Sequence, residues 1–251
     1  IRSAGDLRCV TGLPVIGQMP SVMKESEEAW AFRTWTRLQP MLQVQTGDGA
    51  LVCGIMHAGG DDSATRMTNL LAQAASRRGL GCIAITRQLE GTTLRLADAV
   101  HFPANFLVRM VGENPEKPCL LGIDEEWTWT AEQRRQWQAA MACWRSLSNV
   151  VVLIDLPPVE MPETLILAEQ LPNLVWAATS GGTNAQKVGE TLAMYRDAGC
   201  RLVGARRLIW SLARLSEPPA TLVSASAIGF YGDRGERAVS EEDGPGDGFL
   251  A

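Results

Sequence analysis

Residues 51–86 of the chain read LVCGIMHAGGDDSATRMTNLLAQAASRRGLGCIAIT, and this stretch predicts the fold. An apolar run at 51–56 is followed by a turn that contains Gly59 and Gly60. Apolar and small residues then recur at helical spacing and lead to a second apolar run at 82–85. This pattern is typical of a strand, a glycine turn, a helix and a second strand, the βαβ unit of a parallel sheet. In a nucleotide-binding protein, phosphate would lie in this turn, at the N-terminus of the helix.

The residues of the turn match a phosphate-binding loop poorly. Such a loop reads GxxxxGK[ST], because a lysine must reach the terminal phosphates and a hydroxyl must hold magnesium. The three lysines of the chain, at 24, 117 and 187, all lie elsewhere. Asp61 and Asp62 add negative charge that repels a phosphate, although Asp62 would also serve as a helix N-cap. We favour a degenerate loop over one that still binds nucleotide through backbone amides alone.

Composition indicates a soluble globular protein with no affinity for nucleic acid. The 251 residues suit one large or two small domains, and 46% of them are hydrophobic and 20% charged. The net charge is -5 and the basic residues are dispersed, so the electrostatic footprint of a nucleic-acid-binding protein is missing. The sequence has no run of 18 apolar residues, and it begins with Ile1 rather than Met. We therefore expect membrane contact only through a segment outside this sequence or through a partner.

The cysteines and histidines do not predict a metal site. Six cysteines are scattered without CxxC spacing, which indicates buried thiols in a reducing compartment. The two histidines are His57 and His101, and we interpret His57 as a residue at the end of the first strand rather than as a ligand.

Asp155 is the strongest candidate for a functional carboxylate. It ends the β-branched run at 150–155, in SNVVVLIDLPPV, which predicts a central parallel strand. An acid at the carboxyl end of such a strand is where a Walker B residue would hold magnesium or its water.

The other patterns alternate helices with strands, which predicts a doubly wound α/β sheet. Trp137 and Trp144 recur at helical spacing with Ala140 and Met141, which is typical of a core face rather than of a cofactor site. We expect an extended lead-in at 1–22 and strands at 119–123, 174–178 and 199–203. We expect helices at 26–38, 163–170 and 183–196, and one more that begins after a capping box at 130–133.

The order of these motifs resembles the cytoplasmic P-loop domain of bacterial tyrosine autokinases, the partners of polysaccharide chain-length regulators. The resemblance covers about residues 6–205 and rests on GLPVIGQMP at 12–20, the unit at 51–72, VVLIDLPPV at 151–159 and the pattern at 175–205. It implies a mostly parallel, three-layer αβα sheet of the P-loop NTPase type, with a lead-in and N-terminal helix at 1–40 and the degenerate P-loop domain at 41–205. The family forms rings through an ExxRxxR helix, and the resemblance therefore implies a homo-oligomer as one assembly. Arg33 matches this motif, but Trp30 replaces its glutamate, which argues against ring formation.

The active residues of that family are mostly replaced. In the alignment, Gly59, Gly60 and Asp61 lie in the phosphate loop. Asp62 stands at the position of the last glycine of the motif, Ser63 at that of its lysine, and Ala64 and Thr65 at those of its hydroxyl residues. Thr86 and Gln88 stand at the expected aspartates after the second strand, so Asp155 alone remains. A tyrosine-rich tail is missing too, since the only tyrosines are Tyr195 and Tyr231. The resemblance implies ATP and Mg²⁺ as cofactors only if the loop is functional, and otherwise none.

The last stretch, residues 208–251, resembles the middle of an atypical NAD-dependent epimerase of the short-chain dehydrogenase/reductase family. SASAIGFYGDRG carries the resemblance: Ser226 aligns roughly with the catalytic serine of that family, and Tyr231 is the second candidate residue. No GxGxxG motif precedes this segment and no YxxxK motif follows it. Residues 206–251 would add a helix at 206–215 and a strand at 221–226, the latter joining the preceding sheet, and end in a polar tail.

Three functional hypotheses follow. The first is a catalytically inactive autokinase-like domain, cytoplasmic and at the inner face of a bacterial membrane, that acts as a protein partner in polysaccharide synthesis or export. The second is an ATP-binding autokinase or ATPase that uses Asp155 with an atypical loop. The third, supported least, is an oxidoreductase fragment based on Ser226 and Tyr231.

Overall fold

The computed structural model describes residues 4–19, 26–42, 49–58, 63–87, 116–123, 130–179 and 184–208. All of them belong to one compact unit, Ile1–Arg214, and the second unit, Leu215–Ala251, lies outside the described residues. Among the described residues, no helix is long and apolar enough to cross a membrane.

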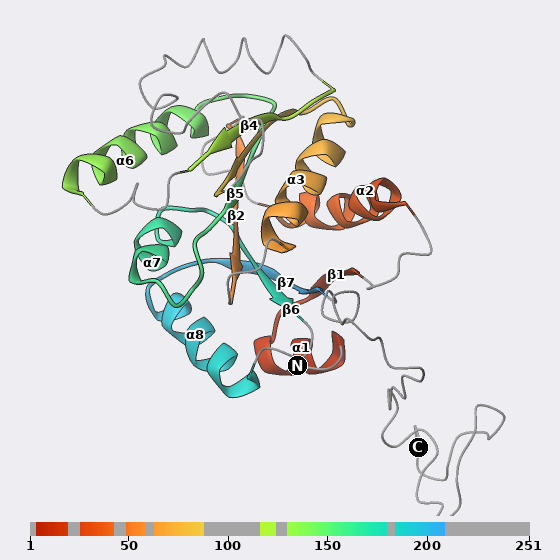
Figure 1. The fold of residues 1–251 in the computed structure, drawn as a ribbon, viewed down its shortest axis with the longest axis vertical. Helices are drawn as coiled ribbons and strands as arrows, with labels where there is room; N and C mark the ends of the chain where they lie inside the picture. Colours follow the sequence, from red (N-terminus) through yellow and green to blue (C-terminus); the bar gives the residue numbers. More distant parts are fainter. Residues whose placement is uncertain are drawn as a thin grey trace, which may run out of the picture. The chain divides into compact units, whose positions relative to one another are not determined.

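In the described part of the chain, seven strands form one sheet in which every neighbouring pair is parallel (Figure 1). Its order is β1-β7-β6-β2-β5-β3-β4, so β2 and β5 lie at its centre. This arrangement confirms the predicted doubly wound α/β fold. The strands are β1 (Val15–Met19), β2 (Leu51–His57), β3 (Gly81–Thr86), β4 (Cys119–Gly122), β5 (Val150–Asp155), β6 (Leu174–Thr179) and β7 (Leu202–Leu208).

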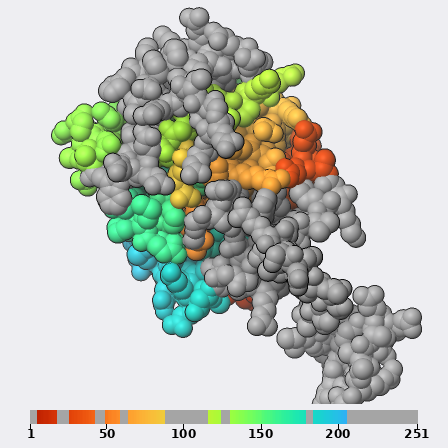
Figure 2. All heavy atoms as spheres, viewed as in Figure 1, coloured from red at the N-terminus to blue at the C-terminus, as the bar shows by residue number. Residues whose placement is uncertain are grey.

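Helices cover both faces of the sheet, which gives the predicted three layers. One apolar cluster joins the sheet to α1, α6, α7 and α8, and a second joins the opposite face to α2 and α3. Helices α3, α6, α7 and α8 supply much of the coloured surface in Figure 2. The helices are α1 (Ala4–Thr11), α2 (Glu27–Leu38), α3 (Ser63–Ser76), α6 (Ala131–Arg145), α7 (Pro162–Ala168) and α8 (Ala185–Asp197), with the short 3₁₀ helix η1 at Gln39–Met41.

The central strands are buried on both sides, as their apolar sequences predict. All six residues of β5 are buried, and Trp137 and Trp144 of α6 pack edge to face with their ring centroids 6.0 Å apart. Gly54 in β2 lies in close packing, because a Cβ there would lie 2.6 Å from a methyl carbon of Leu171, which would have to shift. The capping box at Thr130 is present as predicted.

The N-terminal segment differs from the expected extended lead-in. Residues 4–11 form α1, whose Leu7 is fully buried, and Gly12 ends the helix with a φ of 66°. Glycine adopts this left-handed conformation without strain, and its N–H bonds to the carbonyl of Arg8. Residues 15–19 then join the sheet as β1.

The end of the α/β unit also differs from the sequence prediction. The helix predicted at 183–196 is α8, whose N-cap is Asn184, and the Asn184 side chain accepts the N–H of Gln186. Residue 183 lies outside the described residues. The strand predicted at 199–203 begins later, because Gly199 has a φ of 82° just after α8. Residues 206–208, expected in a helix, belong to β7, where pairing with β1 and β6 satisfies the backbone.

Candidate functional site

The candidate site lies at the carboxyl edge of the sheet, where β2, β5 and β3 end side by side. These strands end at His57, Asp155 and Thr86, and α3 begins at Ser63 on the chain that leaves β2. Open parallel α/β sheets bind their ligands at this edge. The fold therefore gathers here side chains that are up to about a hundred residues apart in sequence.

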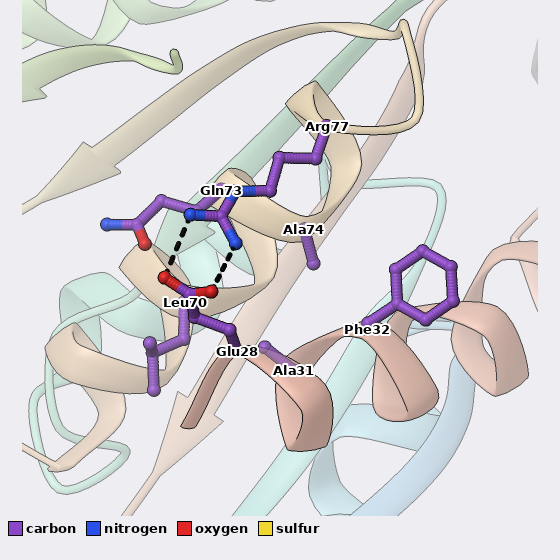
Figure 3. A pocket seen from close by; sticks show the side chains of 7 residues that line it. All are labelled: Glu28, Ala31, Phe32, Leu70, Gln73, Ala74 and Arg77. Carbon is purple, nitrogen blue, oxygen red and sulfur yellow. Dashed lines mark hydrogen bonds and ion pairs between the residues drawn. The ribbon is translucent and has the colours of Figure 1, made fainter. Parts of the chain in front are cut away.

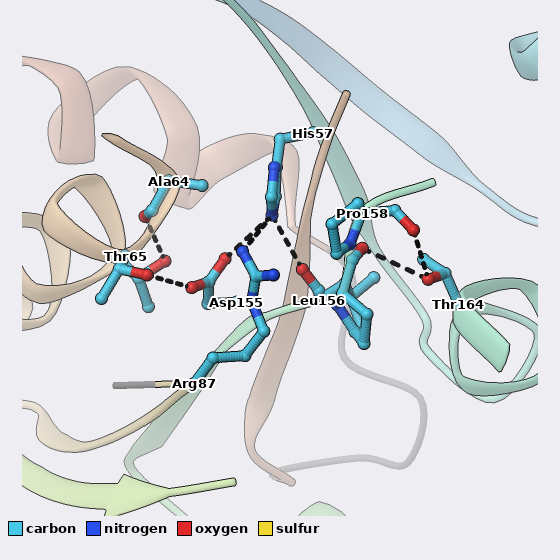
Figure 4. A network of polar contacts seen from close by, with 10 residues as sticks. His57, Ala64, Thr65, Arg87, Asp155, Leu156, Pro158 and Thr164 are labelled. Atoms are coloured by element: carbon cyan, nitrogen blue, oxygen red, sulfur yellow. Dashed lines mark hydrogen bonds and ion pairs between the residues drawn. The ribbon is translucent and has the colours of Figure 1, made fainter. Parts of the chain in front are cut away.

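Thr65 and Asp155, both singled out from the sequence, are in direct contact. The Thr65 hydroxyl, in the first turn of α3, donates a hydrogen bond of 2.5 Å to Oδ2 of Asp155 (Figure 4). Asp155 is fully buried at the end of β5. Because a hydrogen bond to a carboxylate is stronger than one between neutral groups, this contact ties the start of α3 to the central strand.

His57 joins Asp155 to the backbone of the next segment. Its Nε2 lies 3.6 Å from Oδ1 of Asp155 and 3.0 Å from the carbonyl oxygen of Leu156, and the ring is almost fully buried. The structure thus confirms His57 as a strand-end residue. It also gives His57 a place in the site, which the sequence analysis did not assign.

Arg87 is the residue that sequence analysis missed. It directly follows β3, and its Nη2 lies 2.9 Å from Nε2 of His57. A guanidinium can only donate, so this contact requires a bare Nε2 and places the imidazole proton on Nδ1, whereas a bond to the Leu156 carbonyl requires the proton on Nε2. The two contacts select opposite tautomers and therefore compete. A charged residue directly after an apolar parallel strand was the signal that could have identified Arg87.

The remaining predicted site residues are placed as follows. Ser63 is the first residue of α3. Ala64, at one hydroxyl position, is buried, and its side chain has no oxygen that could bind a metal. Thr86 is buried at the end of β3. Six others lie outside the described residues: Gly59, Gly60, Asp61, Asp62, Ser226 and Tyr231.

The described residues of the site do not fit the magnesium ion that a P-loop fold implies. Magnesium requires a near-octahedral set of oxygen ligands, and among the described residues the side chains expected to supply oxygens are Thr65 and Asp155, which are hydrogen-bonded to each other. A guanidinium adjoins them through His57 and would repel a second cation. Among the described residues, no three His, Cys, Asp or Glu side chains are grouped to hold a metal.

A hollow lies between α2 and α3, away from the carboxyl edge of the sheet (Figure 3). It is crossed by a two-pronged ion pair in which Arg77 Nη1 and Nη2 lie 2.7 and 2.9 Å from the carboxylate oxygens of Glu28. This hydrogen-bonded partner lowers the pKa of Glu28. Nearby, Arg78 lies over the ring of Phe32, 4.6 Å from its centroid. These contacts join two outer helices and supply no reactive group.

Comparison with known proteins identifies the fold but gives no sequence-level family. No family model matches the chain, and no curated protein matches it significantly. Three solved structures are similar over most of their length: the BceF tyrosine kinase domain, the chimerical protein CapA2B2, and the kinase domain of the Escherichia coli tyrosine kinase ETK.

The agreement with these structures is extensive in shape and low in sequence. The BceF domain matches with a TM-score of 0.63 at 14% identity, and the match covers 84% of this chain and 99% of the BceF chain. CapA2B2 gives 0.58 at 15% identity, covering 82% and 98%. ETK gives 0.61 at 11% identity, covering 89% and 100%. The chain therefore has the fold of the bacterial tyrosine kinase domains.

Proposed function

We propose that the chain is a catalytically inactive, autokinase-like P-loop domain that acts as a partner or regulatory module in cell-surface polysaccharide synthesis or export. The observation that carries the proposal is the direct bond between Thr65 and Asp155. These residues stand at the positions that would hold magnesium in an active relative, and here they are hydrogen-bonded to each other.

The chemistry of phosphoryl transfer supports inactivity. Its catalysis consists almost entirely of positioning and charge stabilisation by a lysine, metal ions and acids. In this chain Ser63 stands at the lysine position, and Thr86 and Gln88 stand at the acids. Losing these charges removes most of the stabilisation that the transition state would need.

The supply of phosphate acceptors also argues against autophosphorylation. Of the two tyrosines, Tyr195 is fully buried, and burial raises the pKa of its hydroxyl. A hydroxyl inside the core cannot reach a nucleotide on a neighbouring molecule without unfolding. Tyr231 would then be the sole tyrosine acceptor, in place of the tyrosine-rich tail of active autokinases.

The partner role and the location are proposed from the family resemblance. A module of this kind would bind a protein of a polysaccharide assembly at the cytoplasmic face of a bacterial membrane, alone or as a homo-oligomer. Neither nucleotide nor metal would be needed for that binding.

The alternative is an ATP-binding autokinase or ATPase with an atypical loop. It is favoured by the retention of a hydroxyl and an acid, Thr65 and Asp155, at the first turn of α3 and the end of β5. Breaking their mutual bond would free both for a metal.

Calorimetric titration of ATP and ADP with Mg²⁺ into the purified chain separates the two functions. We expect no binding at millimolar nucleotide. The matched variant is Asp155→Asn, which keeps the shape of the side chain, with Glu190→Gln on exposed α8 as the control. Nucleotide binding that Asp155→Asn weakens and Glu190→Gln does not would overturn the proposal.

The regulatory part needs a test in cells. Removing the chain from its host should reduce or shorten the surface polysaccharide, and the native chain and Asp155→Asn, if both accumulate to the same level, should restore it equally. Failure of a folded Asp155→Asn variant to restore it would show that the site performs chemistry.

A further inference from the structure

The cluster at the carboxyl edge contains its own cation. Arg87 Nη2 and Asp155 Oδ1 lie 2.9 and 3.6 Å from the same nitrogen of His57. The two charged groups therefore cannot be further apart than the sum of these distances. We infer that Arg87 is a built-in replacement for the divalent metal beside Asp155, so that the site excludes Mg²⁺ and stays intact without it.

Sheet topology brings Arg87 to this position. Arg87 follows β3 and His57 ends β2, and β5, with Asp155 at its end, lies between these two strands. Neighbouring strands are about 4.8 Å apart, so a side chain that joins the ends of β3 and β2 must pass over the end of β5. Figure 4 shows the guanidinium of Arg87 and the carboxylate of Asp155 both directed at the ring of His57.

The buried carboxylate needs such a group. Asp155 has no solvent exposure, and an ionised carboxylate is stable in that environment only when it is paired and hydrogen-bonded. In a magnesium site the metal supplies the positive charge. Here Thr65 supplies a hydrogen bond and His57 Nε2 lies 3.6 Å from Oδ1. In the proposed arrangement Arg87, which contacts the same nitrogen of His57, balances the charge of the carboxylate.

The same group excludes a metal. A guanidinium remains protonated at every physiological pH and cannot ligate, so it would repel a divalent ion placed beside it. The strand end that carries Arg87 also has Thr86 and Gln88 where the family resemblance places acids. This short segment therefore has no acid at the two positions where the resemblance places one, and it carries a cation between them.

The inference deepens the proposed function, on which it rests for the position of the former magnesium site. It is tested with Mn²⁺, detected by electron paramagnetic resonance, and with the thermal unfolding midpoint measured with and without Mg²⁺. The native chain should bind no Mn²⁺ at millimolar concentration, and its midpoint should not move. Arg87→Ala and the longer neutral variant Arg87→Gln should unfold at lower temperature, bind Mn²⁺ at least about tenfold more tightly than the native chain, and regain stability with Mg²⁺.

The controls are chosen on the same chain. Arg87→Lys keeps the positive charge and should bind no Mn²⁺, and Arg134→Ala, on the exposed surface of α6, should behave as the native chain. Adding Asp155→Asn to Arg87→Gln should abolish the gained Mn²⁺ binding, because it removes the carboxylate.

Two results would overturn the inference. One is Mn²⁺ binding by the native chain that Asp155→Asn removes. The other is a folded Arg87→Gln variant that gains no Mn²⁺ binding. Both are distinct from failure of the proposed function, which would appear as nucleotide binding, with or without metal, in the calorimetric titration.

Discussion

Replacing Thr65 with valine tests whether its hydroxyl holds the buried carboxylate. Valine keeps the branched shape of threonine and has a similar helix propensity, so the change removes mainly the hydrogen bond to Oδ2 of Asp155. A hydrogen bond to a charged group contributes about 1.5–3 kcal/mol, and the acceptor here is fully buried. We expect Thr65→Val to lower the free energy of unfolding by about 2 kcal/mol.

The measurement is urea unfolding followed by tryptophan fluorescence. With a slope of about 2 kcal/mol/M, this loss lowers the midpoint by about 1 M and leaves the slope unchanged. The matched control is Thr36→Val on α2, where the hydroxyl also donates a hydrogen bond, in this case to the backbone carbonyl of Phe32 2.8 Å away, but lies on the surface. It should change stability by no more than about 0.5 kcal/mol. Equal shifts in the two variants would refute the reasoning, because burial of the acceptor would then contribute nothing.

Two further predictions concern the core. In the native chain a thiol reagent should modify the exposed Cys9 rapidly and Cys53 only on unfolding, because burial raises the pKa of Cys53 to about 12; labelling of both at one rate would contradict this. Gly54→Ala should lower the free energy of unfolding in urea by about 1–3 kcal/mol, since the new Cβ would lie 2.6 Å from Leu171. Its control, Gly189→Ala in α8, has open space around the new methyl group and should raise the free energy of unfolding by about 0.5–1 kcal/mol. A stabilising Gly54→Ala would show that β2 does not need the close approach.

Sequence analysis predicted those elements whose signals are local. β5 is a continuous run of branched and apolar residues, and α6 begins with a capping box. The sequence of each element therefore marks it without knowledge of its neighbours. α1 was missed because only a few apolar residues mark its buried side, and Leu7 becomes core only when the rest of the chain folds around it. β7 extends to Leu208 because strands on both sides pair with it, which no local pattern reveals.

The candidate site was predicted only in part, for the same reason. Asp155 and Thr65 could be identified because each stands at a fixed offset from a strand or a turn. Their bond to each other, and the contact of Arg87 with His57, depend on which strands lie side by side and on side chains that cross a third strand. Comparison with a family motif also directs attention to the positions of that motif, and Arg87 lies outside them.

In the proposed function, the internal cluster would keep the domain folded without a bound nucleotide. A ligand present at about a hundred times its dissociation constant stabilises a protein by about 2.7 kcal/mol, so a domain that no longer binds nucleotide forfeits a contribution of this size. One charge-assisted hydrogen bond to a buried carboxylate contributes a comparable amount, and here it is always present. A stability that is independent of nucleotide and metal leaves the folded surface available at all times, which suits a permanent protein partner better than a switch driven by ATP.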